Sequence, residues 1–222
     1  LKKKNFLGSS CIYPKNSKTP IKENSLLNGK LEKTNEAYAL AKITGIKLSE
    51  SIHLQYKRDI ICLMPTNIYG IDDNFQISSS HVIPGLISKF LKSIKTNSKV
   101  EVMGTGKPLR EFLHVDDLSN AIYLCLKLSK KRIKDKFKNK LPLINVGTGK
   151  NISIKNLVKM IAKIVNYKGK ITFNSKYPDG TFKKNLDSKL IRQLGWSPKI
   201  NLKEGLEKVI SSRYQKLNNH NL

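Results

Sequence analysis

The chain has 222 residues, enough for one large domain or two small ones, and a formal net charge of +26 at neutral pH. Such a charge could indicate that the protein binds nucleic acid or an anionic membrane. The lysines are scattered along the whole chain, however, and aromatic residues do not alternate with them as a base-stacking surface requires. We therefore predict a lysine-rich solvated surface and no nucleic-acid partner, with a charge that would attract a phosphate-bearing substrate.

No apolar run reaches the length of a membrane span, and the first apolar region is too short for a signal peptide. The three cysteines lie far apart, without the spacing of a zinc site or the density of a disulfide scaffold. We expect a cytoplasmic protein with free thiols, no membrane partner and no metal. Cys62 and Cys125 lie in apolar runs and are predicted to pack in the core, whereas Cys11 has polar neighbours.

Short apolar runs predict strands, and apolar residues at helical spacing predict helices. The predicted strands cover residues 5–7, 59–64, 99–103, 111–115, 143–146 and 170–173. Helical periodicity covers residues 25–55, 82–94, 118–128, 154–165, 186–194 and 202–214. The N-cap candidates are Thr34 or Asn35, Asp116 or Asp117, and Ser153. Loops are expected at 65–81, at the turn 104–108 and at the lysine-rich segment 130–140, and the alternation of strands and helices indicates an α/β protein with a mostly parallel sheet.

Tyr38 and Lys42 lie four residues apart in a predicted helix, so their side chains share one face. A lysine cation close to a phenol stabilises the phenolate, which can then exchange a proton with a carbonyl or an alcohol. The spacing alone is weak evidence, because Tyr123 and Lys127 repeat it in an apolar helix, where we predict a core tyrosine and a surface lysine. Context favours the first pair, since polar residues follow two predicted parallel strands, and ligands bind at the carboxyl ends of such strands.

A serine followed by Tyr-x-x-x-Lys resembles the signature of the short-chain dehydrogenase/reductase superfamily, in its extended branch acting on nucleotide sugars. The resemblance spans nearly the whole chain in ordered blocks, which read FLGSSCIYPK, TNEAYALAK, MPTNIYG, SSHVIP, GTGKPLREFLHVDD, NVGTG and PDGT. It implies the carboxy-terminal part of a Rossmann-like doubly wound parallel sheet plus a smaller α/β substrate-binding domain. Residues 1–76 and 112–148 would form the partial NAD(P)-binding domain, and residues 77–111 and 149–222 the substrate-binding domain.

The blocks are most similar to members that epimerise GDP-4-keto-6-deoxy-D-mannose at two sugar carbons and then reduce its ketone with NADPH. The resemblance assigns Ser9, Tyr38 and Lys42 to the reduction: Ser9 would orient the keto oxygen, Tyr38 would protonate it, and Lys42 would bind the nicotinamide ribose. It assigns Cys11 and His81 to the epimerisation. Protons next to a ketone are acidic, and inverting such a carbon takes a base on one face and an acid on the other.

The same resemblance assigns the residues that would bind ligands. The NADP(H)-binding set comprises Leu7, Gly8, Ser9, Ser10, Tyr38, Lys42, Pro65, Thr66, Asn67, Ile68 and His81. The GDP-sugar would contact Lys89, Arg110 and Asp179, with Arg110 suited to a pyrophosphate through its forked guanidinium. Met103 stands where these relatives often have tryptophan, which bears on the affinity for the substrate. A homodimer packed through the helix that carries Tyr38 is implied as well.

The extended family begins with a glycine-rich βαβ unit, and about a hundred residues of that kind would precede the region that this sequence resembles. We therefore expect the sequence to be a fragment that is inactive by itself. Three alternatives stay open: a UDP-sugar 4-epimerase or dehydratase, which shares Tyr-x-x-x-Lys without needing Cys11 and His81; a basic nucleic-acid-binding module; and a structural relative without activity.

Overall fold

The computed structural model describes residues 3–219, which form two compact units. Within the described residues, unit 1 comprises residues 3–68, 111–150 and 184–199, and unit 2 comprises residues 69–110, 151–183 and 200–219. The expected division assigned residues 149–222 to the substrate domain, whereas residues 184–199 belong to unit 1. Apolar side chains of this segment pack in the core of unit 1, as described below.

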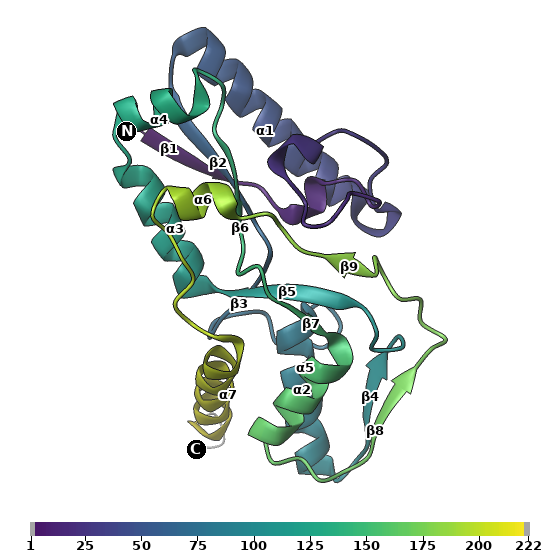
Figure 1. Cartoon of the computed structure of the whole chain (residues 1–222). Coiled ribbons are helices and arrows are strands. Elements are labelled where there is room, and N and C mark those ends of the chain that lie inside the picture. The colour runs from purple at the N-terminus through teal and green to yellow at the C-terminus, as the bar shows by residue number, and fades with distance from the viewer. Residues whose placement is uncertain (1–2, 220–222) are drawn as a thin grey trace. The chain divides into compact units, whose positions relative to one another are not determined.

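A three-stranded parallel sheet forms the centre of unit 1 (Figure 1). Its order is β1 (Lys3–Leu7), β2 (Asp59–Pro65) and β6 (Leu143–Val146), with Phe6 opposite Cys62 and Cys62 opposite Leu143. Parallel strands need crossover connections. Here α1 (Glu36–Tyr56) connects β1 to β2, and α3 (Val115–Lys127) and α4 (Lys130–Phe137) precede β6. The expected α/β fold with a parallel sheet is confirmed.

Helix α1 is shorter than the periodic segment 25–55 suggested, because the chain first makes two 3-10 turns, Glu23–Ser25 and Lys33–Asn35. The helix buries Ala39, Ile43 and Ile46, at the spacing of one helical face. It approaches β1 closely at Gly45, where a Cβ atom would lie 2.2 Å from the ring of Phe6. The glycine therefore lets the helix that carries Tyr38 and Lys42 lie directly against β1.

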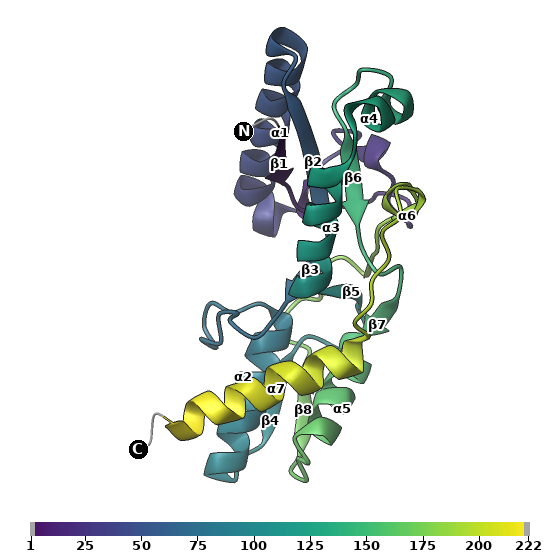
Figure 2. The same ribbon diagram turned by 90° about the vertical axis from the view of Figure 1, so that its left-hand side faces the viewer.

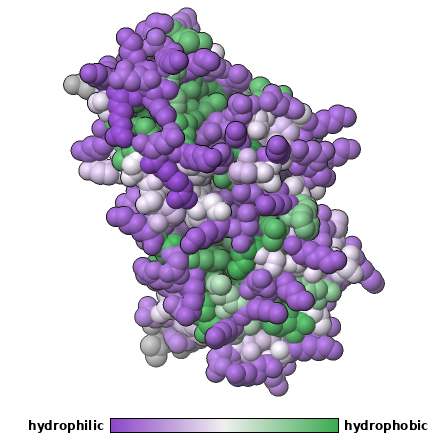
Figure 3. Space-filling view, in the orientation of Figure 1, coloured by the Kyte–Doolittle hydropathy of each residue, from purple (hydrophilic) through white to green (hydrophobic). Residues whose placement is uncertain are grey.

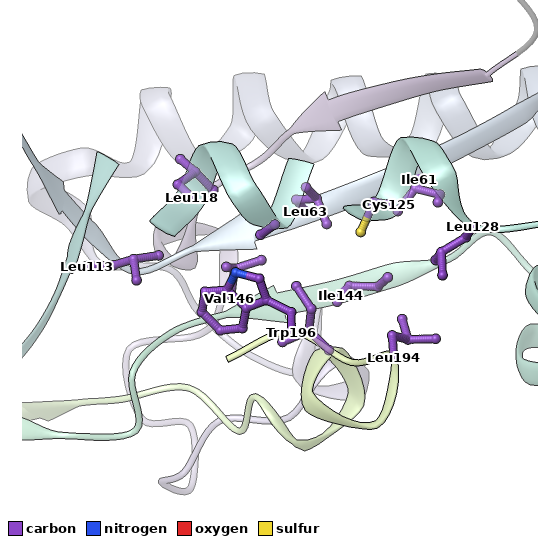
Figure 4. Packing of buried hydrophobic residues seen from close by; sticks show 12 residues of the cluster. Ile61, Leu63, Leu113, Leu118, Cys125, Leu128, Ile144, Val146, Leu194 and Trp196 are labelled. Atoms are coloured by element: carbon purple, nitrogen blue, oxygen red, sulfur yellow. The ribbon is translucent and has the colours of Figure 1, made fainter. Parts of the chain in front are cut away.

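One core cluster of unit 1 lies between the sheet, α3 and the segment around Trp196 (Figure 4). The cluster comprises Ile61, Leu63, Leu113, Leu118, Ala121, Cys125, Leu128, Ile144, Val146, Ile191, Leu194 and Trp196. Trp196 donates its indole N–H to the carbonyl of Asp117 at 3.0 Å, and the buried Asp117 carboxylate accepts from the backbone N–H of Lys199 at 2.9 Å. These contacts fix 184–199, including α6 (Lys189–Gln193), in unit 1.

Unit 2 contains the parallel pair β4 (Val100–Met103) and β8 (Ile171–Asn174) and the helices α2 (Val82–Thr96), α5 (Ile154–Ile164) and α7 (Leu202–Asn219) (Figure 2). Helix α2 contacts β4 and α5, and α5 contacts α7. Ser153 caps α5 as predicted, since its hydroxyl accepts from the N–H of Asn156 at 3.1 Å. A further sheet contains β3 (Asn67–Tyr69), β5 (Leu109–His114), β7 (Asn151–Ser153) and β9 (Lys183–Lys184); in β3, β5 and β9 the chain passes from one unit to the other.

Several predicted local features were wrong. The segment 130–140 is not a loop, because Ser129 caps α4, and Ile133 and Phe137 of that helix pack against the core. The segment 65–81 contains strand β3. Helix α3 begins at Val115, and its N-cap is His114, whose Nδ1 accepts from the N–H of Asp116 at 3.2 Å. Tyr123 is not a core residue but 62% exposed, because α3 buries the opposite face through Leu118, Ala121 and Cys125.

The positions of Cys62 and Cys125 agree with the prediction that both pack in the core. Cys62 and Cys125 are fully buried in apolar surroundings, and all three cysteines are free. The face in Figure 3 is predominantly hydrophilic, with smaller apolar areas. Within residues 3–219, no helix is long and apolar enough to span a membrane. The same described residues contain no cluster of three or more His, Cys, Asp or Glu side chains able to hold a metal ion.

Candidate active site

The chain makes a tight turn after β1, at the carboxyl end of the sheet of unit 1. The N–H of Gly8 donates to the carbonyl of Leu63 at 2.9 Å, and a Cβ atom on Gly8 would lie 3.2 Å from the sulfur of Met64. A glycine thus keeps the loop close to β2. Ser9 then caps the 3-10 turn Ser10–Ile12, since its Oγ accepts from the N–H of Cys11 at 3.2 Å. Ser9 and Cys11 are therefore fixed by a single turn.

Helix α1 brings Tyr38 and Lys42 to the same strand end. The Lys42 ammonium donates to the carbonyl of Leu7 at 2.9 Å and lies 5.7 Å from the centroid of the Tyr38 ring. Tyr38 is 49% exposed and so open to a ligand. Lys127 lies similarly close to the Tyr123 ring, at 5.4 Å, so the lysine–ring distance does not distinguish the pairs. What distinguishes Lys42 is its bond to Leu7, next to the turn of Ser9 and Cys11.

The segment 65–68, predicted to line the cofactor, is held by Glu111. The Thr66 hydroxyl and the Asn67 amide both donate to the backbone carbonyl of Glu111, at 3.1 and 2.8 Å. The carboxylate of Glu111 is fully buried and accepts from the N–H groups of Gly149 at 2.7 Å and Leu186 at 2.9 Å. Burial raises the pKa of Glu111, and these hydrogen bonds oppose that rise. Glu111 thereby joins the segment 65–68 to the turn after β6.

A second buried polar group fixes the chain just beyond Cys11. The hydroxyl of Tyr13 donates to the side-chain oxygen of Asn145 at 2.6 Å, and burial raises the pKa of Tyr13 well above its usual range. The Asn145 amide donates in turn to the carbonyls of Ile21 at 2.9 Å and Asp187 at 3.2 Å. Asn145 in β6 therefore anchors the segment between Cys11 and α1.

The sequence prediction did not single out Glu111 or Asn145, although each lies in a quoted block. Each is a charged or amide side chain inside an otherwise apolar run. Such a pattern indicates a buried polar group, which must have hydrogen-bond partners, and it could have pointed to both residues. Asn35 was expected only as a helix cap. Its side-chain nitrogen instead lies 3.2 Å from the sulfur of Cys11.

Unit 2 holds the remaining predicted residues. His81 occupies the N-cap position of α2, where its carbonyl accepts from the N–H of Gly85 at 3.0 Å and its side chain makes no capping bond. Lys89, on the same helix, donates to the carbonyl of Glu101 at 3.0 Å. His81 belongs to unit 2, whereas Cys11 and Tyr38 belong to unit 1.

Arg110 and Asp179 come together around two glycine turns of unit 2. Asp179 accepts from the N–H of Thr105 at 2.9 Å and from its hydroxyl at 2.5 Å, and a Cβ atom on Gly104 would lie 2.4 Å from the carboxylate. Hydrogen bonds from Thr105 and the charge of Arg110 hold the pKa of Asp179 below its usual range. Arg110 donates to the carbonyl of Thr181 at 2.6 Å, and its burial lowers its pKa. These residues form a pre-ordered polar cluster.

Taken together, the fold and the Ser9, Tyr38 and Lys42 group define a Rossmann-like protein of the extended short-chain dehydrogenase/reductase class. Residues 1–147 match the NAD dependent epimerase/dehydratase family, so the chain belongs to this family, as the sequence resemblance predicted. It is 49% identical over 211 residues to the GDP-L-fucose synthase of Escherichia coli (strain K12), covering 95% of this chain and 64% of that protein. It is 47% identical over 217 residues to the probable GDP-L-fucose synthase 1 of Oryza sativa subsp. japonica, covering 94% and 63%. The chain thus spans less than two thirds of these relatives.

Among solved structures, the chain is similar to a GDP-6-OMe-4-keto-L-xylo-heptose reductase from C. jejuni, with a TM-score of 0.88 and 35% identity over 97% of this chain and 71% of that one. A GDP-mannoheptose C4 reductase from Campylobacter jejuni with NADP bound gives a TM-score of 0.80 at 35% identity, covering 96% and 70%. Both of these proteins are reductases of GDP-linked sugars.

Proposed function

We propose that this chain carries the residues that epimerise GDP-4-keto-6-deoxy-D-mannose and reduce it, with NADPH, to GDP-L-fucose. The observation that carries the proposal is the convergence at one strand end of the reductive pair Tyr38–Lys42 and the turn that holds Ser9 and Cys11. The names of the relatives support the product: the one at 49% identity is named GDP-L-fucose synthase, and the one at 47% identity probable GDP-L-fucose synthase 1.

In the reductive step, Tyr38 gives its proton to the ketone oxygen, and Lys42 stabilises the phenolate that remains. NADPH, when bound, supplies the hydride. The residues suit the nicotinamide ribose, because the Lys42 ammonium has three donors, and its bond to Leu7 uses one of them. The nicotinamide half of the site is assigned to Gly8 and to Thr66 and Asn67, whose side chains donate to the carbonyl of Glu111.

In the epimerisation step, Cys11 and His81 act as base and acid on carbons next to the ketone. Cys11 lies within the 3-10 turn Ser10–Ile12 of unit 1, and His81 lies at the N-cap position of α2 in unit 2. Removal of the proton from one face and its return to the other inverts the carbon. A UDP-sugar 4-epimerase would not require a thiol at position 11, so Cys11 separates the two functions.

The GDP moiety is assigned to the polar cluster of unit 2. The guanidinium of Arg110 has five N–H donors, of which the bonds to Leu109 and Thr181 use only those on Nη1. The donors on Nη2 and Nε suit the oxygens of a pyrophosphate. Asp179, ordered by Thr105, and Lys89 on α2 complete the proposed contacts.

A homodimer through α1 is part of the proposal. This helix leaves Leu40, Leu48, Leu54 and Tyr56 each more than half exposed, and large exposed apolar side chains on one element favour association. Light scattering on the purified protein should give twice the mass of the monomer, and Leu48→Glu should return it to a monomer. A monomeric mass at all concentrations would contradict this part of the proposal.

The function is tested in a chimera in which this chain replaces the region that it matches in the E. coli relative. The chimera should oxidise NADPH with GDP-4-keto-6-deoxy-D-mannose. Tyr38→Phe should lower the rate by about a hundredfold or more. Tyr123→Phe is the matched control, because its lysine lies at a similar distance from the ring, and this variant should leave the rate unchanged.

The epimerisation is tested separately by exchange of substrate protons with solvent deuterium. Cys11→Ser should slow this exchange while sparing the reduction of a substrate that needs no epimerisation. A folded chimera without turnover, or a Tyr38→Phe variant with full activity, would refute the proposed function. Unchanged exchange in Cys11→Ser would remove the epimerase step and leave a reductase.

A further inference from the structure

Asn35 stands at the N-cap of α1, yet its side chain does not cap the helix. Asparagine is among the best N-cap residues, because its oxygen can accept from the N–H groups of the first turn. Here no such bond forms, and the side-chain oxygen is buried without a hydrogen-bond partner among residues 3–219. The amide nitrogen instead donates to the sulfur of Cys11, at 3.2 Å. The side chain of Asn35 therefore contacts Cys11 and does not cap the helix.

Cys11 is held at both its backbone and its side chain. The backbone N–H donates to Ser9 Oγ at 3.2 Å, and the sulfur accepts from Asn35. These two bonds fix the residue within its turn. The second bond places a hydrogen-bond donor against the sulfur. Among the described residues, no carboxylate makes a hydrogen-bond contact with it. An amide N–H stabilises a thiolate more than a thiol, because hydrogen bonds to a charged acceptor are stronger.

We propose that Asn35 is a positioning residue for Cys11, which directs the sulfur and stabilises its anionic form, so that Cys11 can act as the base of the epimerisation. This inference rests on the proposed function for its purpose, but the effect on the sulfur can be measured without any activity.

The other two cysteines make the measurement simple. Cys62 and Cys125 are fully buried, and burial raises the pKa of each thiol to about 11. Cys11 is partly exposed. Iodoacetamide should therefore alkylate Cys11 first in the folded chain, and peptide mass spectrometry assigns the modified residue. The rate of alkylation against pH then follows the thiolate of Cys11.

Asn35→Asp is the decisive variant. Aspartate is as good an N-cap as asparagine and has nearly the same shape, so helix α1 should stay intact. It replaces the donor with a negative charge, which disfavours a thiolate close by. We expect the pH midpoint of alkylation to rise by about one unit, which slows the reaction at neutral pH about tenfold. Asn35→Ser, which can cap but does not reach the sulfur, should show a smaller shift in the same direction.

Asn201→Asp is the matched control. It makes the same substitution before α7, where Asn201 does cap the helix by accepting from the N–H of Glu204 at 3.0 Å. The alkylation profile of Cys11 should not change. Thermal melting by circular dichroism shows whether each variant is folded. If Asn35→Asp does not fold, the alkylation profile of Asn35→Ser tests the inference instead. Coincident profiles for wild type and the folded Asn35 variants would overturn the inference.

The chimera separates this inference from the proposed function. If Asn35→Asp shifts the alkylation profile and also slows deuterium exchange, both stand. If the profile shifts but the chimera has no activity in any form, the inference about the sulfur holds while the proposed function fails. If the chimera is active and the profile does not move, Asn35 has no influence on the thiol and the inference alone is refuted.

Discussion

Gly147→Ala should destabilise the protein far more than an exposed glycine substitution, because Gly147 faces the buried carboxylate of Glu111. A Cβ atom at this position would lie 2.3 Å from Oε1 and 2.9 Å from Cδ of Glu111. To reach an ordinary contact the carboxylate must move by roughly 1 Å, which would disturb the hydrogen bond that its Oε1 accepts from the N–H of Gly149. Hydrogen bonds to a charged group contribute about 1.5–3 kcal/mol each, so we expect a loss of about 2–4 kcal/mol.

Urea unfolding of the full chain, followed by circular dichroism, measures this loss as a lower midpoint at constant slope. Gly29→Ala is the control, since its Cβ would meet only Pro14, at 3.3 Å, and should cost less than about 1 kcal/mol. In a Glu111→Ala background the obstacle is absent, so the two changes should not add and should show a coupling of about 2 kcal/mol. A cost below about 0.5 kcal/mol, or full additivity, would refute the reasoning.

Three further predictions concern other contacts. Trp196→Ala should lower the free energy of unfolding by about 3–5 kcal/mol in the same urea assay, because it empties a core site; a loss below 1 kcal/mol would contradict the packing. Tyr13→Phe leaves the oxygen of Asn145 buried without this donor and should cost about 1–3 kcal/mol by urea unfolding, whereas no change would exclude the bond. The lowered pKa of Asp179 means that its bonds to Thr105 persist at neutral pH and are lost as pH falls below the usual aspartate range, about 4; amide NMR of Thr105 should show this transition, and a flat titration would contradict it.

The strands and the long helices could be predicted because local pattern decides them. The apolar run 60–64 is continuous and stops at a proline, which is the pattern of a buried parallel strand. Helix α4 could not be predicted in the same way, because lysines surround Ile133 and Phe137, the two residues that pack inward. The cap of α3 was missed because an aspartate is the usual cap, whereas here a buried histidine fills that role.

In the candidate site, too, some residues could be predicted from the sequence and others could not. Ser9, Tyr38 and Lys42 are recognisable from spacing and resemblance, because Tyr38 and Lys42 lie four residues apart and Ser9 follows shortly after an apolar strand. The roles of Glu111 and Asn145 depend on partners far away in the chain, such as Leu186 and Tyr13, which no local pattern indicates. The contact of Asn35 with Cys11 was hidden for a different reason: the same side chain at the same position would ordinarily cap the helix.

The bond between Tyr13 and Asn145 has a consequence for the order of folding. The two residues are 132 positions apart, so the chain beyond Cys11 cannot reach its final anchor until β6 has been synthesised and has joined the sheet. During translation, β1 and β2 can pair earlier, with α1 packed on β1, while the turn carrying Cys11 still lacks this support. The thiol on which the proposed chemistry depends would then be among the last parts of unit 1 to reach its working geometry.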